Sequence, residues 1–206
     1  MRITGLLIIA VIVGGACRSA NPIAPSATPA GPVVRPTWGL SGQSNADFLR
    51  PYLAPYAEVV GYASSSVNIA CFAPDDQCWL KLEPTLHQHM DAFLWWQGES
   101  DICFSCDGFL DAAGEWRPTP GAYASKLADV IRRVRAAAAD PALFVVVMQL
   151  YDGRLDGEQA AFAAADGHAV VVPTRDIGFG RDGAHMLAVQ YEALAGRIAT
   201  MLKAGR

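Results

Sequence analysis

The sequence predicts one α/β domain with three layers, in which helices cover both faces of a central parallel sheet. Short apolar runs alternate with helical segments from about residue 37 onward, the pattern of strand–helix–strand units. The run 92–96 is apolar throughout, which is typical of a strand buried on both faces. A chain of 206 residues has the length of a single domain.

The expected elements follow in order along the chain. Strands are expected at 37–40, 58–63, 92–96, 143–150 and 169–172. Helices are expected at 120–139, 158–165 and 186–202. Ligands of such sheets bind at the carboxyl ends of the strands, so polar motifs at those ends are the candidates for a site.

The first 17 residues have the features of an export signal. Arg2 precedes an apolar run, residues 6–13, that is too short to span a bilayer. Gly14-Gly15-Ala16-Cys17 resembles a bacterial lipoprotein processing site, with Cys17 as the lipidated residue; ordinary signal cleavage nearby is the alternative. We expect a protein exported to the periplasm or cell surface that meets the membrane only through such an anchor.

Residues 18–36 are rich in proline, alanine and serine, as expected of a tether, so the folded domain is expected to span 37–206. The net charge of −4 lacks the basic character of a nucleic-acid-binding protein. A literal G-x-G-x-x-G at 178–183 has too little chain after it for a dinucleotide fold, and His87 and His89 fit incidental surface histidines. We therefore expect no cofactor and no metal.

Four cysteines remain if Cys17 is lipidated. An even number in an exported protein favours disulfides, and we expect the local pairs Cys71–Cys78 and Cys103–Cys106. The same four thiols at these spacings are also compatible with a zinc site, and Cys103 and Cys106 with a redox pair.

Three motifs carry candidate chemistry. Ser44 follows the first strand in a turn with Gly42, where a hydroxyl can act as a nucleophile once a base accepts its proton, or can simply cap a helix. Asp182 and His185 lie three residues apart, so the acid can orient the imidazole, although an incidental cap also fits. The third motif is the polar segment 97–101 after the buried strand, in which the Gln97 amide can donate to an oxyanion.

Together these motifs resemble the SGNH-hydrolase superfamily, in its carbohydrate acetylesterase branch of sialate O-acetylesterases and acetylxylan esterases. Gly42-Gln43-Ser44-Asn45 resembles the nucleophile block, residues 96–101 the third block, and Asp182-Gly183-Ala184-His185 the final block. The resemblance implies a flavodoxin-like fold and a serine esterase that removes acetyl groups from O-acetylated sugars, with Ser44, His185 and Asp182 as the triad. It also makes Glu99 a rival or helper to Asp182.

One block departs from the branch pattern. Ser65-Ser66 stands where a Gly-Gly pair is usual, so the resemblance implies the backbone N–H of Ser66 as an oxyanion donor beside Ser44 and Gln97, provided that the loop does not require positive φ. This departure keeps open a surface-anchored carbohydrate-binding lipoprotein with little turnover. A broader lipid esterase or thioesterase is the other alternative, and Trp79 and Trp116 are candidate sugar platforms.

Overall fold

The computed structural model describes residues 34–102, 108–110, 112, 114 and 116–204. The predicted signal peptide with Cys17, nearly all of the predicted tether, and the cysteines Cys103 and Cys106 lie outside these residues. Among the helices of the described residues, none combines the length and the apolar character that crossing a membrane requires.

A five-stranded parallel sheet forms the centre of the fold. In spatial order its strands are β2 (Glu58–Val60), β1 (Thr37–Gly42), β3 (Ala92–Trp96), β6 (Val145–Met148) and β7 (Ala169–Val172). Counted along the chain, these five strands have the order 2-1-3-4-5, which is the flavodoxin-like arrangement. The predicted fold class is therefore confirmed, and the topological switch point lies between β1 and β3.

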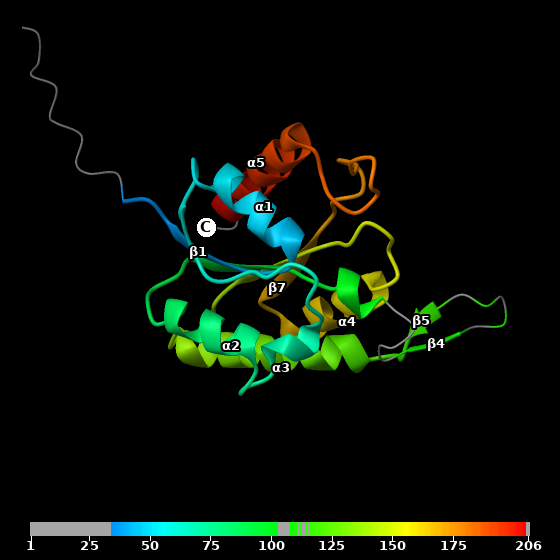
Figure 1. The fold of residues 1–206 in the computed structure, drawn as a ribbon. Helices are drawn as coiled ribbons and strands as arrows, with labels where there is room; N and C mark the ends of the chain where they lie inside the picture. Colours follow the sequence, from blue (N-terminus) through cyan, green and yellow to red (C-terminus); the bar gives the residue numbers. More distant parts are fainter. Residues whose placement is uncertain (1–33, 103–107, 111, 113, 115, 205–206) are drawn as a thin grey trace, which may run out of the picture. The chain divides into compact units, whose positions relative to one another are not determined.

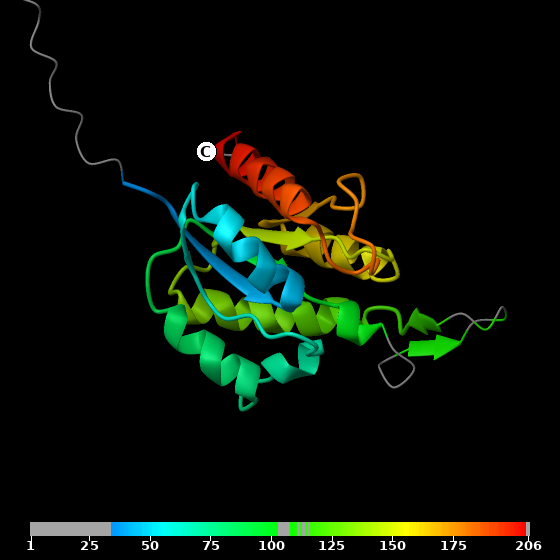
Figure 2. The same ribbon diagram turned by 45° about the horizontal axis from the view of Figure 1, so that its top comes forward.

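Helices cover both faces of the sheet (Figure 1). The helices are α1 (Ser44–Leu53), α2 (Gln77–Leu82), α3 (Ala122–Ala137), α4 (Asp156–Asp166) and α5 (Ala188–Ala204). Figure 2 shows α1 and α5 side by side on one face, while α2, α3 and α4 lie on the other. Short 3₁₀ turns occur at η1 (Ile69–Phe72), η2 (Glu83–Thr85) and η3 (Glu99–Asp101), and a separate antiparallel pair is formed by β4 (Gly108–Leu110) and β5 (Trp116–Pro118).

The core explains why β3 is apolar along its whole length. Trp95 packs edge-on against Phe72 of η1, and Trp96 packs against Tyr191 of α5 on the opposite face. Both tryptophans are fully buried, one on each face of the sheet. A parallel strand covered on both faces has no solvent side to which an alternate residue could turn.

Candidate active site

The nucleophile turn joins β1 to α1. Gly42 has a φ of 139°, and a Cβ at this position would lie 1.9 Å from the carbonyl oxygen of Trp96, so the turn requires glycine. Gln43 is the N-cap residue of α1 and Ser44 is its first helical residue. The side chain of Ser44 does not cap the helix; its Oγ lies 2.9 Å from Nε2 of His185.

The loop before α5 carries the acid and the base. His185 Nδ1 lies 2.7 Å from Oδ2 of Asp182. The other carboxylate oxygen of Asp182 accepts the backbone N–H groups of His185 at 2.9 Å and Ala184 at 3.0 Å. These bonds, led by the two that His185 donates, lower the pKa of Asp182 to about 2. Asp182 is therefore ionised at any ordinary pH and can stabilise an imidazolium.

The three residues lie at the carboxyl edge of the sheet, beside the switch point between β1 and β3, where doubly wound folds bind ligands. The side chain of His185 is 39% exposed and that of Asp182 is 55% exposed. This part of the site is consequently open to solvent, and a bulky substrate can reach it.

Gln43 links the nucleophile turn to the third motif, a role that the sequence did not reveal. Its Oε1 accepts the backbone N–H groups of Gly98 at 3.0 Å and Ser100 at 3.2 Å. Its Nε2 donates to Oγ of Ser100 at 2.9 Å. The only sequence signal for this role was the place of Gln43 inside the motif 42–45.

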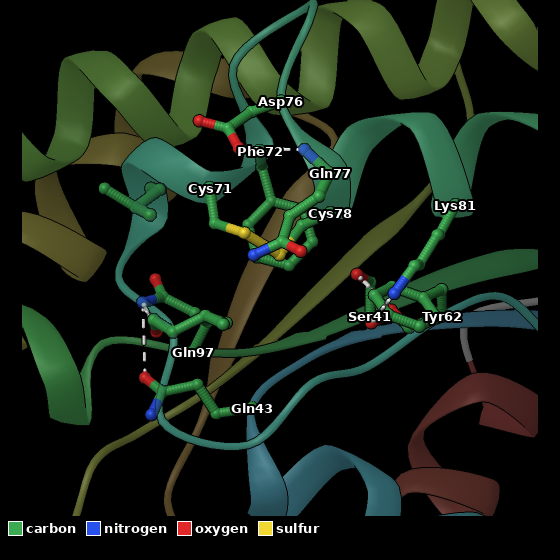
Figure 3. The surroundings of a disulfide bond; sticks show 12 residues. Ser41, Gln43, Tyr62, Cys71, Phe72, Asp76, Gln77, Cys78, Lys81 and Gln97 are labelled. Atoms are coloured by element: carbon green, nitrogen blue, oxygen red, sulfur yellow. Dashed lines mark hydrogen bonds between the residues drawn. A yellow bond between two sulfur atoms is a disulfide. The ribbon is translucent and has the colours of Figure 1, made fainter.

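Gln97 does not face an incoming substrate. Its side chain is fully buried, and Nε2 donates to Val67 O at 3.1 Å, to Gln43 Oε1 at 3.2 Å (Figure 3) and to the carboxylate of Asp101. An amide has two hydrogens, and here both are directed to acceptors within the protein. In this structure Gln97 is therefore not an oxyanion donor, contrary to expectation; it fixes the loop that carries Ser66 and Val67.

Ser66 has a φ of 58°, in the left-handed region that favours glycine. The loop does adopt positive φ, so the condition placed on the Ser66 donor is not met; serine nevertheless takes this conformation here and keeps its backbone N–H. The side chain of Ser66 is exposed, so the strain is confined to the backbone.

We expect Ser66→Gly to raise the free energy of unfolding by about 0.5–1 kcal/mol, because relief of left-handed strain slightly exceeds the added entropy of the unfolded chain. Esterase activity should be retained, since the backbone N–H remains. Chemical denaturation measures the change. Ser65→Gly is the matched control and should lower stability. An equal effect of the two substitutions would refute the assignment of backbone strain to Ser66.

Glu99 is hydrogen-bonded to Asn45, the residue after the nucleophile, and not to His185. Its Oε1 accepts from Nδ2 of Asn45 at 2.8 Å, and its Oε2 is buried with no hydrogen-bond partner among the described residues. Burial raises the pKa of Glu99 above its ordinary value, and the bond from Asn45 offsets part of that rise. The carboxylate that hydrogen-bonds to the His185 ring is that of Asp182. Glu99 therefore has no direct contact with the base.

A raised pKa means that the folded state holds the Glu99 proton more tightly than the unfolded chain does. Stability should therefore rise as pH falls from neutral toward 4.5, the ordinary value for this group. We expect wild type to gain melting temperature relative to Glu99→Gln over this range. Thermal unfolding at several pH values measures the gain, with the exposed Glu192→Gln as control; a constant difference between wild type and Glu99→Gln would contradict the assignment.

The remaining candidates from the sequence are the cysteines, the tryptophans and possible metal ligands. Cys71 and Cys78 form a disulfide (Figure 3), so a zinc site that needs both thiols is excluded. Trp79 is buried, and the guanidinium of Arg133 lies 4.3 Å from the centre of its ring. The expectation that Trp79 forms a sugar platform is therefore wrong. The described residues contain no group of three or more histidine, cysteine or acidic side chains placed to hold a metal. The side chain of Trp116 lies outside what the structure describes.

Residues 59–203 match the family model for carbohydrate esterase, sialic acid-specific acetylesterase. The chain belongs to this family. The match includes Gln97, Asp182 and His185 and begins after Ser44. This carbohydrate esterase is accordingly a carboxylic ester hydrolase, as the sequence predicted. No curated protein matches the sequence.

Solved structures share the fold of this carbohydrate esterase at low identity. A protein of Arabidopsis thaliana is 14% identical with a TM-score of 0.62, over 82% of this chain and 97% of its own. A carbohydrate acetylesterase of Xanthomonas citri is 14% identical with a TM-score of 0.58, over 80% of this chain and 54% of its own. A carbohydrate esterase family 2 enzyme of Corynascus thermopiles is 13% identical with a TM-score of 0.59, over 86% and 68%.

Proposed function

We propose that the protein is a serine esterase that removes acetyl groups from O-acetylated carbohydrate through an acyl-enzyme on Ser44. The observation that carries the proposal is the chain of contacts from Ser44 Oγ to His185 Nε2, 2.9 Å, and from His185 Nδ1 to Asp182 Oδ2, 2.7 Å. An acid, an imidazole and a hydroxyl in this order form the arrangement that activates serine in unrelated hydrolases.

In the proposed reaction, Ser44 Oγ attacks the ester carbonyl carbon while His185 Nε2 accepts the hydroxyl proton. Asp182 holds the proton on Nδ1 and stabilises the imidazolium. When the tetrahedral intermediate collapses, the bond from the carbonyl carbon to the sugar oxygen breaks, and His185 gives its proton to that oxygen. Water then attacks the acetyl-serine, with His185 again accepting and returning the proton, and releases acetate and free Ser44.

The oxyanion donors that we propose are the backbone N–H groups of Ser44 and Ser66. Ser44 is the first residue of α1, where backbone N–H groups have no partner within the helix and the helix dipole favours negative charge. Val67 and Ile69, which follow Ser66, are held by Gln97 and Asp101, so this loop is fixed before substrate arrives. Preorganised donors of this kind contribute about 10²–10³ each to the rate.

An acetylated carbohydrate is supported as substrate by the family and by the open site. The family description names sialic acid-specific acetylesterases, and the Xanthomonas citri neighbour is named a carbohydrate acetylesterase. We further propose that the enzyme acts outside the cytoplasm, in the periplasm or at the cell surface, tethered through Cys17. Intact-mass measurement of the purified protein from membranes would reveal the lipid on this cysteine.

Acetate release from a panel of O-acetylated glycans and from p-nitrophenyl esters of increasing chain length tests the function. We expect release by wild type from at least one acetylated sugar, a preference for acetyl over longer acyl groups, and none by Ser44→Ala. Preference for long-chain esters would favour a lipid esterase. No release by wild type from any substrate would overturn the esterase proposal in favour of the carbohydrate-binding lipoprotein.

A further inference from the structure

The backbone around His185 is held by hydrogen bonds from two sources. Within its own loop, His185 N donates to Asp182 Oδ1 at 2.9 Å, and Gly180 N donates to His185 O at 2.5 Å. These bonds shape the loop, but Asp182 and Gly180 belong to the same loop as His185. They cannot by themselves fix the distance between His185 and Ser44.

The second source is a pair of side chains from the helices α1 and α5. Asn45 Nδ2 donates to the carbonyl of Ala184 at 2.9 Å, and the N–H of Met186 reaches the Tyr191 hydroxyl at 3.4 Å. The residues on either side of His185 are thus both bonded to this pair. Asn45 directly follows Ser44 in the chain, so the contact at Ala184 ties the base to the nucleophile's own helix.

Asn45 and Tyr191 also hold each other. The Tyr191 hydroxyl donates to Asn45 Oδ1 at 2.6 Å, and both residues are buried. The remaining amide hydrogen of Asn45 is given to Glu99 Oε1 at 2.8 Å. Every polar atom of the Asn45 side chain is therefore used, and the amide cannot turn without leaving buried groups unpaired.

We propose that Asn45 and Tyr191 are positioning residues that fix His185 at hydrogen-bond distance from Ser44. The inference rests on the proposed function of Ser44 as nucleophile. A displacement of about 1 Å in a catalytic group can cost about 10² in rate. The hydrogen bonds of Asn45 and Tyr191 to residues 184 and 186 therefore act on the chemical step and not on substrate binding. Glu99, through Asn45, belongs to the same network.

The ring and the hydroxyl of Tyr191 have separable roles. The ring packs against Phe48, Tyr52 and Trp96, with centroid distances of 6.3, 5.6 and 6.2 Å. Phenylalanine keeps these contacts and removes only the hydroxyl. Tyr52 stacks on the Tyr191 ring but is absent from the bonds to residues 184–186, so Tyr52→Phe is a matched control.

The test compares wild type, Tyr191→Phe and Tyr52→Phe in p-nitrophenyl acetate hydrolysis and in ¹⁵N NMR of the histidine rings. The His185 signals are assigned through His185→Ala. We expect Tyr191→Phe to lower kcat by about 10–10² with KM within about twofold, and to shift or broaden the His185 signals. Tyr52→Phe should change neither. Asn45→Ala, checked for folding by circular dichroism, should reproduce the result if Tyr191→Phe does not fold.

The NMR readout separates the two proposals. If wild type shows no hydrolysis but Tyr191→Phe still alters the His185 signals, the esterase proposal fails and the positioning role stands. An active wild type whose kcat and His185 signals are unchanged by Tyr191→Phe would overturn the positioning role. Equal losses in Tyr191→Phe and Tyr52→Phe would also overturn it, since they would point to aromatic packing.

Discussion

Asp182→Asn is expected to lower kcat by about 10⁴, with little change in the fold, the size of effect known for this change in other serine hydrolases. The carboxylate accepts the Nδ1 proton of His185 at 2.7 Å and stays ionised because its pKa is about 2. An amide in its place can present N–H to Nδ1 and so leave the proton on Nε2, where it prevents His185 from accepting the serine proton. Steady-state kinetics on p-nitrophenyl acetate measures the loss.

Glu99→Gln is the matched comparison for this prediction. Glutamine still offers an oxygen to Asn45, so we expect a loss of about tenfold at most, the value of one hydrogen bond. The opposite result, near-full activity in Asp182→Asn with a large loss in Glu99→Gln, would transfer the acid role to Glu99.

Ser44→Ala and His185→Ala should each lower kcat by about 10⁶, and the double variant should lose no more than either one. The two side chains carry out a single step, in which the proton leaves Oγ as it arrives at Nε2 across 2.9 Å. Once one partner is missing, the other has nothing to contribute. The same kinetics measure all three variants, with the exposed Ser65→Ala as control. Additive losses would show that the two residues act in separate steps.

The sequence was sufficient to predict the strands of the sheet and the motifs that form the candidate site. Alternating apolar and amphipathic segments located every strand of the five-stranded sheet, because a parallel strand buried on both faces leaves a clear apolar run such as 92–96. Observed ends differ: the strand expected at 143–150 is Val145–Met148, and the closing helix begins at Ala188, two residues later than expected. Before Val145, the N–H of Leu143 bonds in a turn to Asp140 O, and before Ala188, the N–H of Leu187 bonds to the side chain of Gln190.

Several features depend on contacts that are distant in the chain, and these escaped prediction. The helix α1 contains Pro51 and polar residues, and it is stabilised by packing on α5. Trp79 resembled a surface platform because Arg133, which covers it, lies 54 positions later. The orientation of Gln97 is set by Gln43, Val67 and Asp101, so residue type alone could not show that its amide points inward.

Reaction with a fluorophosphonate, followed by intact mass and peptide mapping, tests the central claim most directly, because only a serine activated by an assembled base reacts rapidly. We predict a single phosphonyl adduct on Ser44 in wild type, none in Ser44→Ala, and much slower labelling in Asp182→Asn. An unlabelled wild type, or an adduct on a different serine, would contradict the assignment of Ser44, His185 and Asp182 as the catalytic triad.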